Sequence, residues 1–202
     1  MKIKITPLVL LALSTSLANA VPMPAFTLTK VLGFRNDSWS FGEKFVVGAT
    51  DITVDALGFI DVGRDGFVNL GHDVGIYKES GTLLTSTTVL GTDPLVSDFR
   101  YHGISPITLF AGQAYRVIGV NNDDLYNIDS SPVIVDPRIT RTGYAYGNST
   151  TLQFLNDFHS AERLWVANFN IGGSVTAPDS GSTAFLAILG IAGMIAVRRK
   201  LS

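Results

Sequence analysis

The chain has 202 residues, with 17 acidic and 15 basic side chains and no cysteine. The lack of cysteine excludes disulfides, thiol catalysis and thiolate metal sites. Five basic residues lie in the terminal segments, so residues 21–176 carry ten basic against sixteen acidic side chains, a net charge of −6. Because nucleic-acid binding needs a basic surface, we expect no nucleic-acid partner.

The first twenty residues have the pattern of a secretory signal peptide. Lys2 and Lys4 form a basic start, Leu8–Leu13 forms an apolar run, and Ala18 and Ala20 supply the small residues that signal peptidase recognises. The apolar run is short for a membrane span. We therefore expect export and cleavage by signal peptidase after residue 20. A first membrane helix that stays attached is the alternative.

Residues 21–176 have the pattern of an all-β domain. Short runs rich in Val, Ile, Thr, Phe and Tyr alternate with Gly, Asp, Asn and Pro turns, and no long stretch has helical periodicity. Glu79–Leu84 and Phe110–Tyr115 look like tight hairpins, with Gly81 at a positive φ in the first. This pattern predicts a two-sheet antiparallel sandwich of jelly-roll type. The predicted strands are 26–35, 38–47, 52–60, 73–78, 83–89, 99–104, 114–120, 127–135, 150–154 and 163–171.

A first polar segment is a candidate calcium site. Asp61, Asp65, Asn69 and Asp73 recur at four-residue steps, and calcium binds through carboxylate and amide oxygens of this kind. The spacing differs from that of an EF-hand loop. A polar turn whose side chains bond their own backbone is the alternative and the favoured interpretation.

A second polar segment, residues 121–129, is a candidate ligand loop. Asn122, Asp123 and Asp124 could bind calcium or sugar, with Tyr126 as a stacking surface. Loops at one end of a sandwich often carry function. A long exposed connection is the alternative.

The two tryptophans are candidate sugar-stacking residues if they are exposed. Trp39 lies near the start of the domain and Trp165 in the last predicted strand. Because large aromatic side chains are usually buried, core packing is the favoured interpretation of both.

No motif points to catalysis. The three histidines form no zinc-binding pattern, and no G-x-S-x-G segment is present. Glycosidases need two facing carboxylates, and Glu43, Glu79 and Glu162 suggest no such pair. We therefore expect no catalytic residues and no cofactor, with calcium as the one ion considered.

The segment 177–202 ends in an apolar run followed by basic residues. Ala184–Val197 is uncharged and would form a helix of about 21 Å, which is marginal for a hydrocarbon core of about 30 Å. The positive-inside rule keeps Arg198, Arg199 and Lys200 in the cytoplasm. From span length and charge alone, a permanent single-pass anchor is favoured.

The polar patch before this run changes that interpretation. Pro178, Asp179, Ser180 and Gly181, followed by the apolar run and the basic end, resemble the VPDSG-CTERM variant of the PEP-CTERM sorting tails. Ala177 stands where that variant usually has Val. The resemblance implies that an exosortase, an integral membrane processing enzyme of Gram-negative bacteria that make exopolysaccharide, processes the tail.

The body also resembles a known group. Ile52–Leu90, Phe99–Gly119 and Leu164–Ile171 match, in order, a β-sandwich domain of unknown function found in exported bacterial proteins with such tails. That domain has no established enzymatic activity.

The sequence therefore predicts an exported protein with three parts: a signal peptide (1–20), a β-sandwich (21–176) and a sorting tail (177–202) with a membrane helix at 184–197. We expect transient residence in the inner membrane, then delivery to the cell surface or extracellular space as a structural or adhesive module that binds glycan or calcium. A secreted carbohydrate-active enzyme and a permanently anchored periplasmic protein are the alternatives.

Overall fold

The computed structural model describes residues 23–128, 131–156 and 164–172. Within these ranges the chain forms strands and no helix, so the all-β prediction is confirmed. The predicted signal peptide, sorting motif and membrane helix lie outside the described residues. The strands are β1 (Phe26–Leu28), β2 (Gly33–Phe34), β3 (Ser40–Val47), β4 (Ile52–Ile60), β5 (His72–Lys78), β6 (Leu83–Val89), β7 (Leu95–Val96), β8 (Phe99–Leu109), β9 (Ala114–Val120), β10 (Tyr126–Asn127), β11 (Val133–Val135), β12 (Ile139–Gly147) and β13 (Ala167–Gly172).

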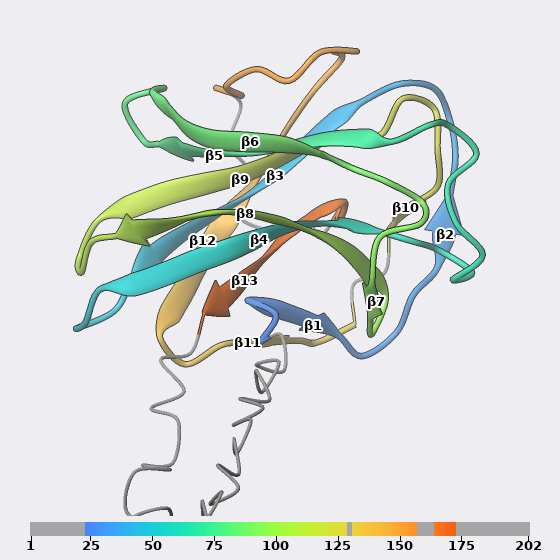
Figure 1. The fold of residues 1–202 in the computed structure, drawn as a ribbon. Helices are drawn as coiled ribbons and strands as arrows, with labels where there is room; N and C mark the ends of the chain where they lie inside the picture. The colour runs from blue at the N-terminus through green and yellow to red at the C-terminus, as the bar shows by residue number, and fades with distance from the viewer. Residues whose placement is uncertain (1–22, 129–130, 157–163, 173–202) are drawn as a thin grey trace, which may run out of the picture. The chain divides into compact units, whose positions relative to one another are not determined.

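The strands pair antiparallel in two larger and two smaller sheets. The five-stranded sheet has the order β12-β3-β9-β5-β6 and the four-stranded sheet the order β13-β4-β8-β7. The small sheets pair β1 with β11 and β2 with β10. Figure 1 shows the two larger sheets as layers, with β2 and β10 near one end. The antiparallel arrangement is therefore confirmed, whereas jelly-roll connectivity remains a prediction.

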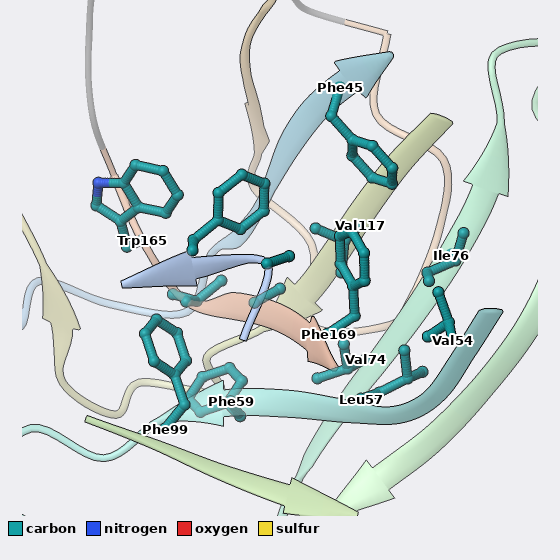
Figure 2. Close-up of a cluster of buried hydrophobic side chains, with 14 of the residues drawn as sticks. Phe45, Val54, Leu57, Phe59, Val74, Ile76, Phe99, Val117, Trp165 and Phe169 are labelled. Carbon is teal, nitrogen blue, oxygen red and sulfur yellow. The ribbon is translucent and has the colours of Figure 1, made fainter. Parts of the chain in front are cut away.

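The facing sides of the two larger sheets share one apolar core. Phe45 and Val117 of the five-stranded sheet lie in the same cluster as Leu57 and Phe169 of the four-stranded sheet (Figure 2). The rings of Phe45 and Phe169 stack with their centroids 4.7 Å apart. Burying a side chain of this size stabilises the fold by about 1.5–3 kcal/mol. Trp165 is completely buried in this cluster, so its favoured interpretation as a core residue is confirmed.

The two predicted hairpins are present. Gly81, in the turn between β5 and β6, has a φ of +88°, and Gly112, between β8 and β9, has a φ of +72°. Residues with a Cβ rarely adopt such angles, which explains glycine at both turns. The amide of Gly81 donates to the carbonyl of Lys78, and the amide of Gln113 donates to that of Phe110.

Several predicted strands differ from the observed ones. The stretch 26–35 is divided into β1 and β2, and 127–135 into β10 and β11, because each half pairs with a different neighbour. β8 continues to residue 109. Strand β12 was not predicted, although it pairs with β3 along residues 139–147 through a bulge at Arg141–Gly143.

The predicted strand 150–154 is wrong. This segment covers the outer face of the five-stranded sheet, where Leu152, Phe154 and Leu155 pack on Tyr77 and Ile118. The carbonyl of residue 155 accepts a hydrogen bond from the guanidinium of Arg116 in β9. The apolar residues that suggested a strand therefore bury a sheet face without joining its edge.

Candidate functional site

One end of the sandwich, which we call the loop end, is held together by hydrogen bonds between distant connections. The amide of Val68 donates to Oδ2 of Asp124 (2.9 Å), and the amide of Trp39 donates to Oδ1 of Asn121 (2.5 Å). These bonds link segments more than fifty residues apart in the chain. The loop end consists of the connections 35–39, 61–71 and 121–125.

His72, the first residue of β5, follows the connection 61–71 and is completely buried. Its ring stacks on Phe59 at 3.9 Å and meets Phe67 edge-on at 4.6 Å. Nδ1 lies 3.0 Å from the carbonyl oxygen of Val120, and Nε2 lies 3.1 Å from Oδ2 of Asp124. A carbonyl and a carboxylate both accept, so both bonds form together only when each ring nitrogen carries a hydrogen.

The carboxylate of Asp124 gathers three donors. Oδ2 accepts from Val68 and lies beside His72, while Oδ1 accepts from the amide of Leu125 at 2.7 Å. Burial acts to raise the pKa of Asp124, but these hydrogen bonds outweigh burial and the pKa is lowered. Asp124 is therefore a structural anion that holds two connections in place.

Beside this network lies a small cleft, which we call the aromatic cleft. Its volume is about 130 Å³, and its walls come from β3, β10, β12 and the segments beside them. Trp39 stacks on Phe41 with centroids 6.3 Å apart, and Phe41 contacts Tyr126 at 4.7 Å. The lining residues are Asn36, Trp39, Phe41, Tyr126, Tyr146 and Leu164.

Hydrogen bonds orient Asn36, whose amide is a polar group of the cleft. The hydroxyl of Tyr126 donates to Oδ1 of Asn36 at 2.8 Å, and Nε1 of Trp39 donates to the Asn36 carbonyl at 3.3 Å. Burial raises the pKa of Tyr126, so its hydroxyl stays protonated as a donor. Because Oδ1 is occupied, Asn36 presents its Nδ2 amide hydrogens, which have no partner within the described residues.

A buried contact between Glu43 and Arg141 lies farther along the inner face of β3. Glu43 is 1% exposed, and its Oε2 accepts from Nε of Arg141 at 2.5 Å. The guanidinium of Arg141 lies 5.1 Å from the ring of Trp165. Burial raises the pKa of Glu43 to about 8, although Arg141 opposes this shift. Among the residues that the structure describes, Oε1 of Glu43 has no hydrogen-bond partner.

The four residues of the candidate calcium set make separate contacts. Oδ2 of Asp61 accepts from Nε of Arg100 at 2.7 Å, and the amide of Gly66 donates to the same carboxylate. Across the described part of the chain, no three His, Cys, Asp or Glu side chains are grouped so as to hold a metal ion. Of the other three residues of the set, Asp65 is exposed, Asn69 donates to the carbonyl of Asn122, and Asp73 accepts from Thr88.

The four residues of the candidate ligand loop lie in different environments. Asp123 forms an exposed ion pair with Arg35 (3.0 Å), Asp124 is part of the buried network, and Asn122 has a φ of +44°. Of the four predicted residues, Tyr126 lines the cleft. It does so together with Trp39, which the sequence singled out separately.

Most of the cleft could not be recognised in the sequence. Phe41, Tyr146 and Leu164 carry no motif. Tyr146 belongs to the strand that was not predicted, and its register opposite Phe41 brings both rings to one face. The alternation of Tyr144 and Tyr146 is the sequence signal from which this strand could have been predicted.

The end of the chain matches a known family model. This model, described as the VPDSG-CTERM motif, matches residues 178–201. The chain ends in a PEP-CTERM-class sorting tail. This tail implies an exported protein that is sorted to the cell surface and processed by an exosortase, a membrane enzyme. No curated protein and no solved structure matches the chain.

The VPDSG-CTERM match includes the four motif residues and the basic end, and begins just after Ala177. The tail prediction is thereby confirmed, whereas the resemblance of the sandwich to a domain family remains a prediction. Within the described residues, no helix has the length and apolar character needed to cross a membrane. The predicted span at 184–197 lies outside them, as do the signal-peptide residues.

Proposed function

We propose that this chain is a cell-surface or extracellular-matrix protein whose β-sandwich is a non-catalytic adhesive module that binds glycan. The sorting tail supports export and surface delivery, and the aromatic cleft supports glycan binding. In this proposal signal peptidase removes the first twenty residues in a Gram-negative bacterium. The chain is held briefly in the inner membrane, and exopolysaccharide is the partner.

The aromatic cleft is the observation that carries the binding proposal. Sugar rings have apolar C–H faces and polar edges, so they suit a site with aromatic walls and few oriented polar groups. Trp39 and Tyr146 supply walls, and the Asn36 amide supplies donors for a ring hydroxyl. A volume of about 130 Å³ suits a single sugar ring of a longer chain.

The carboxylates around the cleft support a non-catalytic role. Asp123 is paired with Arg35, Asp124 with His72, and Glu43 with Arg141. A glycosidase needs two carboxyl groups that face one sugar bond. Each of these three side chains is instead bound to a partner within the fold.

Glycan binding is tested with the purified full chain in a detergent without a sugar head group. We expect Trp39→Ala and Asn36→Ala each to weaken binding of a neutral polysaccharide about tenfold, since each removes one of a few contacts. Leu70→Ala is the matched control, because Leu70 is 97% exposed at the same end but lies outside the cleft. Equal affinity for all four proteins would contradict the proposal.

One observation favours the alternative of a carbohydrate-active enzyme. Glu43 lies two residues from Phe41 on the same strand face, and its raised pKa keeps it protonated near neutral pH, as a general acid requires. Glycan hydrolysis that Glu43→Gln abolishes would establish this alternative over the non-catalytic one.

Tail processing is tested by the intact mass of the mature protein. We expect the mass to lack Arg198–Ser202, and to retain them in a strain without the exosortase. Retention of these residues in both strains would establish the permanent anchor.

A further inference from the structure

A second pocket lies at the opposite end of the sandwich, which we call the turn end. The turn end consists of the hairpin turns 79–82 and 110–113, brought together because Lys78 of β5 pairs with Tyr115 of β9. The pocket has a volume of about 490 Å³. Its lining includes Lys78, Glu79, Ser80, Phe110, Gln113 and Tyr115.

Backbone and side-chain bonds fix the walls of this pocket. The amide of Lys78 donates to the carbonyl of Thr82, which closes the first turn. In the second, the amide of Phe110 donates to the hydroxyl of Tyr115 at 2.9 Å. Phe110 is nevertheless 56% exposed, so its ring faces solvent although its backbone amide is held by this hydrogen bond.

The pocket is locally positive in an acidic domain. Glu79 accepts from Lys44 (2.8 Å) and from Nη2 and Nε of Arg116 (2.7 and 3.1 Å), and the Arg116 bonds lower its pKa to about 2. Lys44 and Arg116 therefore neutralise Glu79, and Lys78 is the lining charge that has no ion-pair partner within the described residues. An anion is therefore favoured here.

Two polar side chains of the pocket have no partner among the residues that the structure describes. Within the described ranges, the Lys78 ammonium and the Gln113 side-chain amide make no hydrogen bond or ion pair. The Ser80 hydroxyl hydrogen-bonds with the hydroxyl of Thr82 at 3.2 Å. An ammonium, an amide and a hydroxyl beside an exposed ring match a ligand with a carboxylate, hydroxyls and an apolar ring face.

We propose that the turn-end pocket binds a carboxylated sugar of a glycan chain. Lys78 pairs with the sugar carboxylate, Gln113 and Ser80 bond its hydroxyls, and Phe110 stacks on the ring. This site is independent of the aromatic cleft, because β3 runs from Ser40 at the loop end to Val47 at the turn end. At about 3.3 Å per residue, the two sites lie roughly 20 Å or more apart. A protein with both sites joins two glycan segments.

The test is a titration of the full chain in detergent, first with glucuronate and then, separately, with glucose. NMR chemical shifts monitor binding. We expect glucuronate to bind with a Kd of the order of 1 mM and glucose at least about tenfold more weakly, since one charge-assisted contact is lost. Lys78→Gln should weaken glucuronate binding about tenfold and remove its preference over glucose. Phe110→Ala should weaken both.

Trp39→Ala and Leu70→Ala are the controls and should leave glucuronate binding unchanged. All substituted side chains of the turn end are exposed at the surface, and Gln113→Ala serves as a second variant if Phe110→Ala lowers the melting temperature. Equal binding of glucose and glucuronate, no effect of Lys78→Gln, or no shift at about 50 mM glucuronate would each overturn the proposal. Loss of binding in Trp39→Ala alone would instead assign the ligand to the aromatic cleft.

Discussion

The loop end and the turn end of the sandwich are built in different ways. At the loop end, connections of several residues are fixed by buried side chains, with Asp124 and Asn121 bonding the backbone of distant segments. At the turn end, short hairpins are closed by their own backbone, with Gly81 and Gly112 at positive φ. The buried carboxylate and amide of the loop end, Asp124 and Asn121, are therefore used for structure, whereas Lys78 and Gln113 at the turn end remain available to a ligand.

The largest expected effect comes from the buried network. Asp124→Asn should destabilise the protein by about 2–3 kcal/mol, because an amide offers one acceptor where the carboxylate faces three N–H groups, leaving buried donors without partners. Urea unfolding measures this change. Asp123→Asn is the matched control and should have little effect, since its ion pair with Arg35 is exposed. Equal losses in the two variants would contradict the distinction between structural and surface charges.

A smaller effect is expected at the turn end. Gly112→Ala should cost about 1–2 kcal/mol, because the φ of +72° is unfavourable for a residue with a Cβ, although the added atom has nothing within 4 Å. Gly103→Ala is the control, since it also meets nothing within 4 Å but has no positive φ. Unfolding in urea should separate the two variants. A loss of the same size in both would show that backbone conformation is not the cause.

The sequence predicts the sandwich better than it predicts the cleft. Five strands, β3, β4, β5, β6 and β9, were located to within two residues, since period-two alternation and glycine turns are local signals. β12 was missed because its Tyr144 and Tyr146 face inward only after the strand pairs with β3. The cleft depends on that register, and register is a long-range property.

The partners of the candidate ligands could not be predicted from the sequence for a related reason. Asp61 and Asp124 were grouped with their neighbours in sequence, but the partners that occupy them, Arg100 and His72, lie 39 and 52 residues away. Composition shows that carboxylates are abundant and does not show which are already bound. The tail was recognised because its signal is contiguous, from Pro178 to the basic end.

Acid should affect the turn end through Glu79. Its folded-state pKa, lowered to about 2 by Arg116, lies below the ordinary value of 4.5, so its stabilisation is present above pH 4.5 and is lost as pH falls towards 2. The effect is modest because the side chain is 37% exposed. Glu79→Gln should therefore flatten, without abolishing, the decline in melting temperature over this range, since Asp124 at the loop end titrates in the same direction. An unchanged slope would show that Glu79 does not contribute to this decline in melting temperature.

Calcium should have the smallest effect on stability. Adding it tests whether the protein partners of the loop-end carboxylates hold them too firmly for an ion to bind. A calcium ion at Asp61 would have to displace Arg100 and the amide of Gly66, and the neighbouring oxygens of Asp65 and Asp73 are not grouped with it. We expect millimolar calcium to leave the melting temperature unchanged. A rise that a chelator reverses, and that Asp61→Asn abolishes, would show that the loop end rearranges to bind the ion. It would also restore the four-residue spacing as a metal signal.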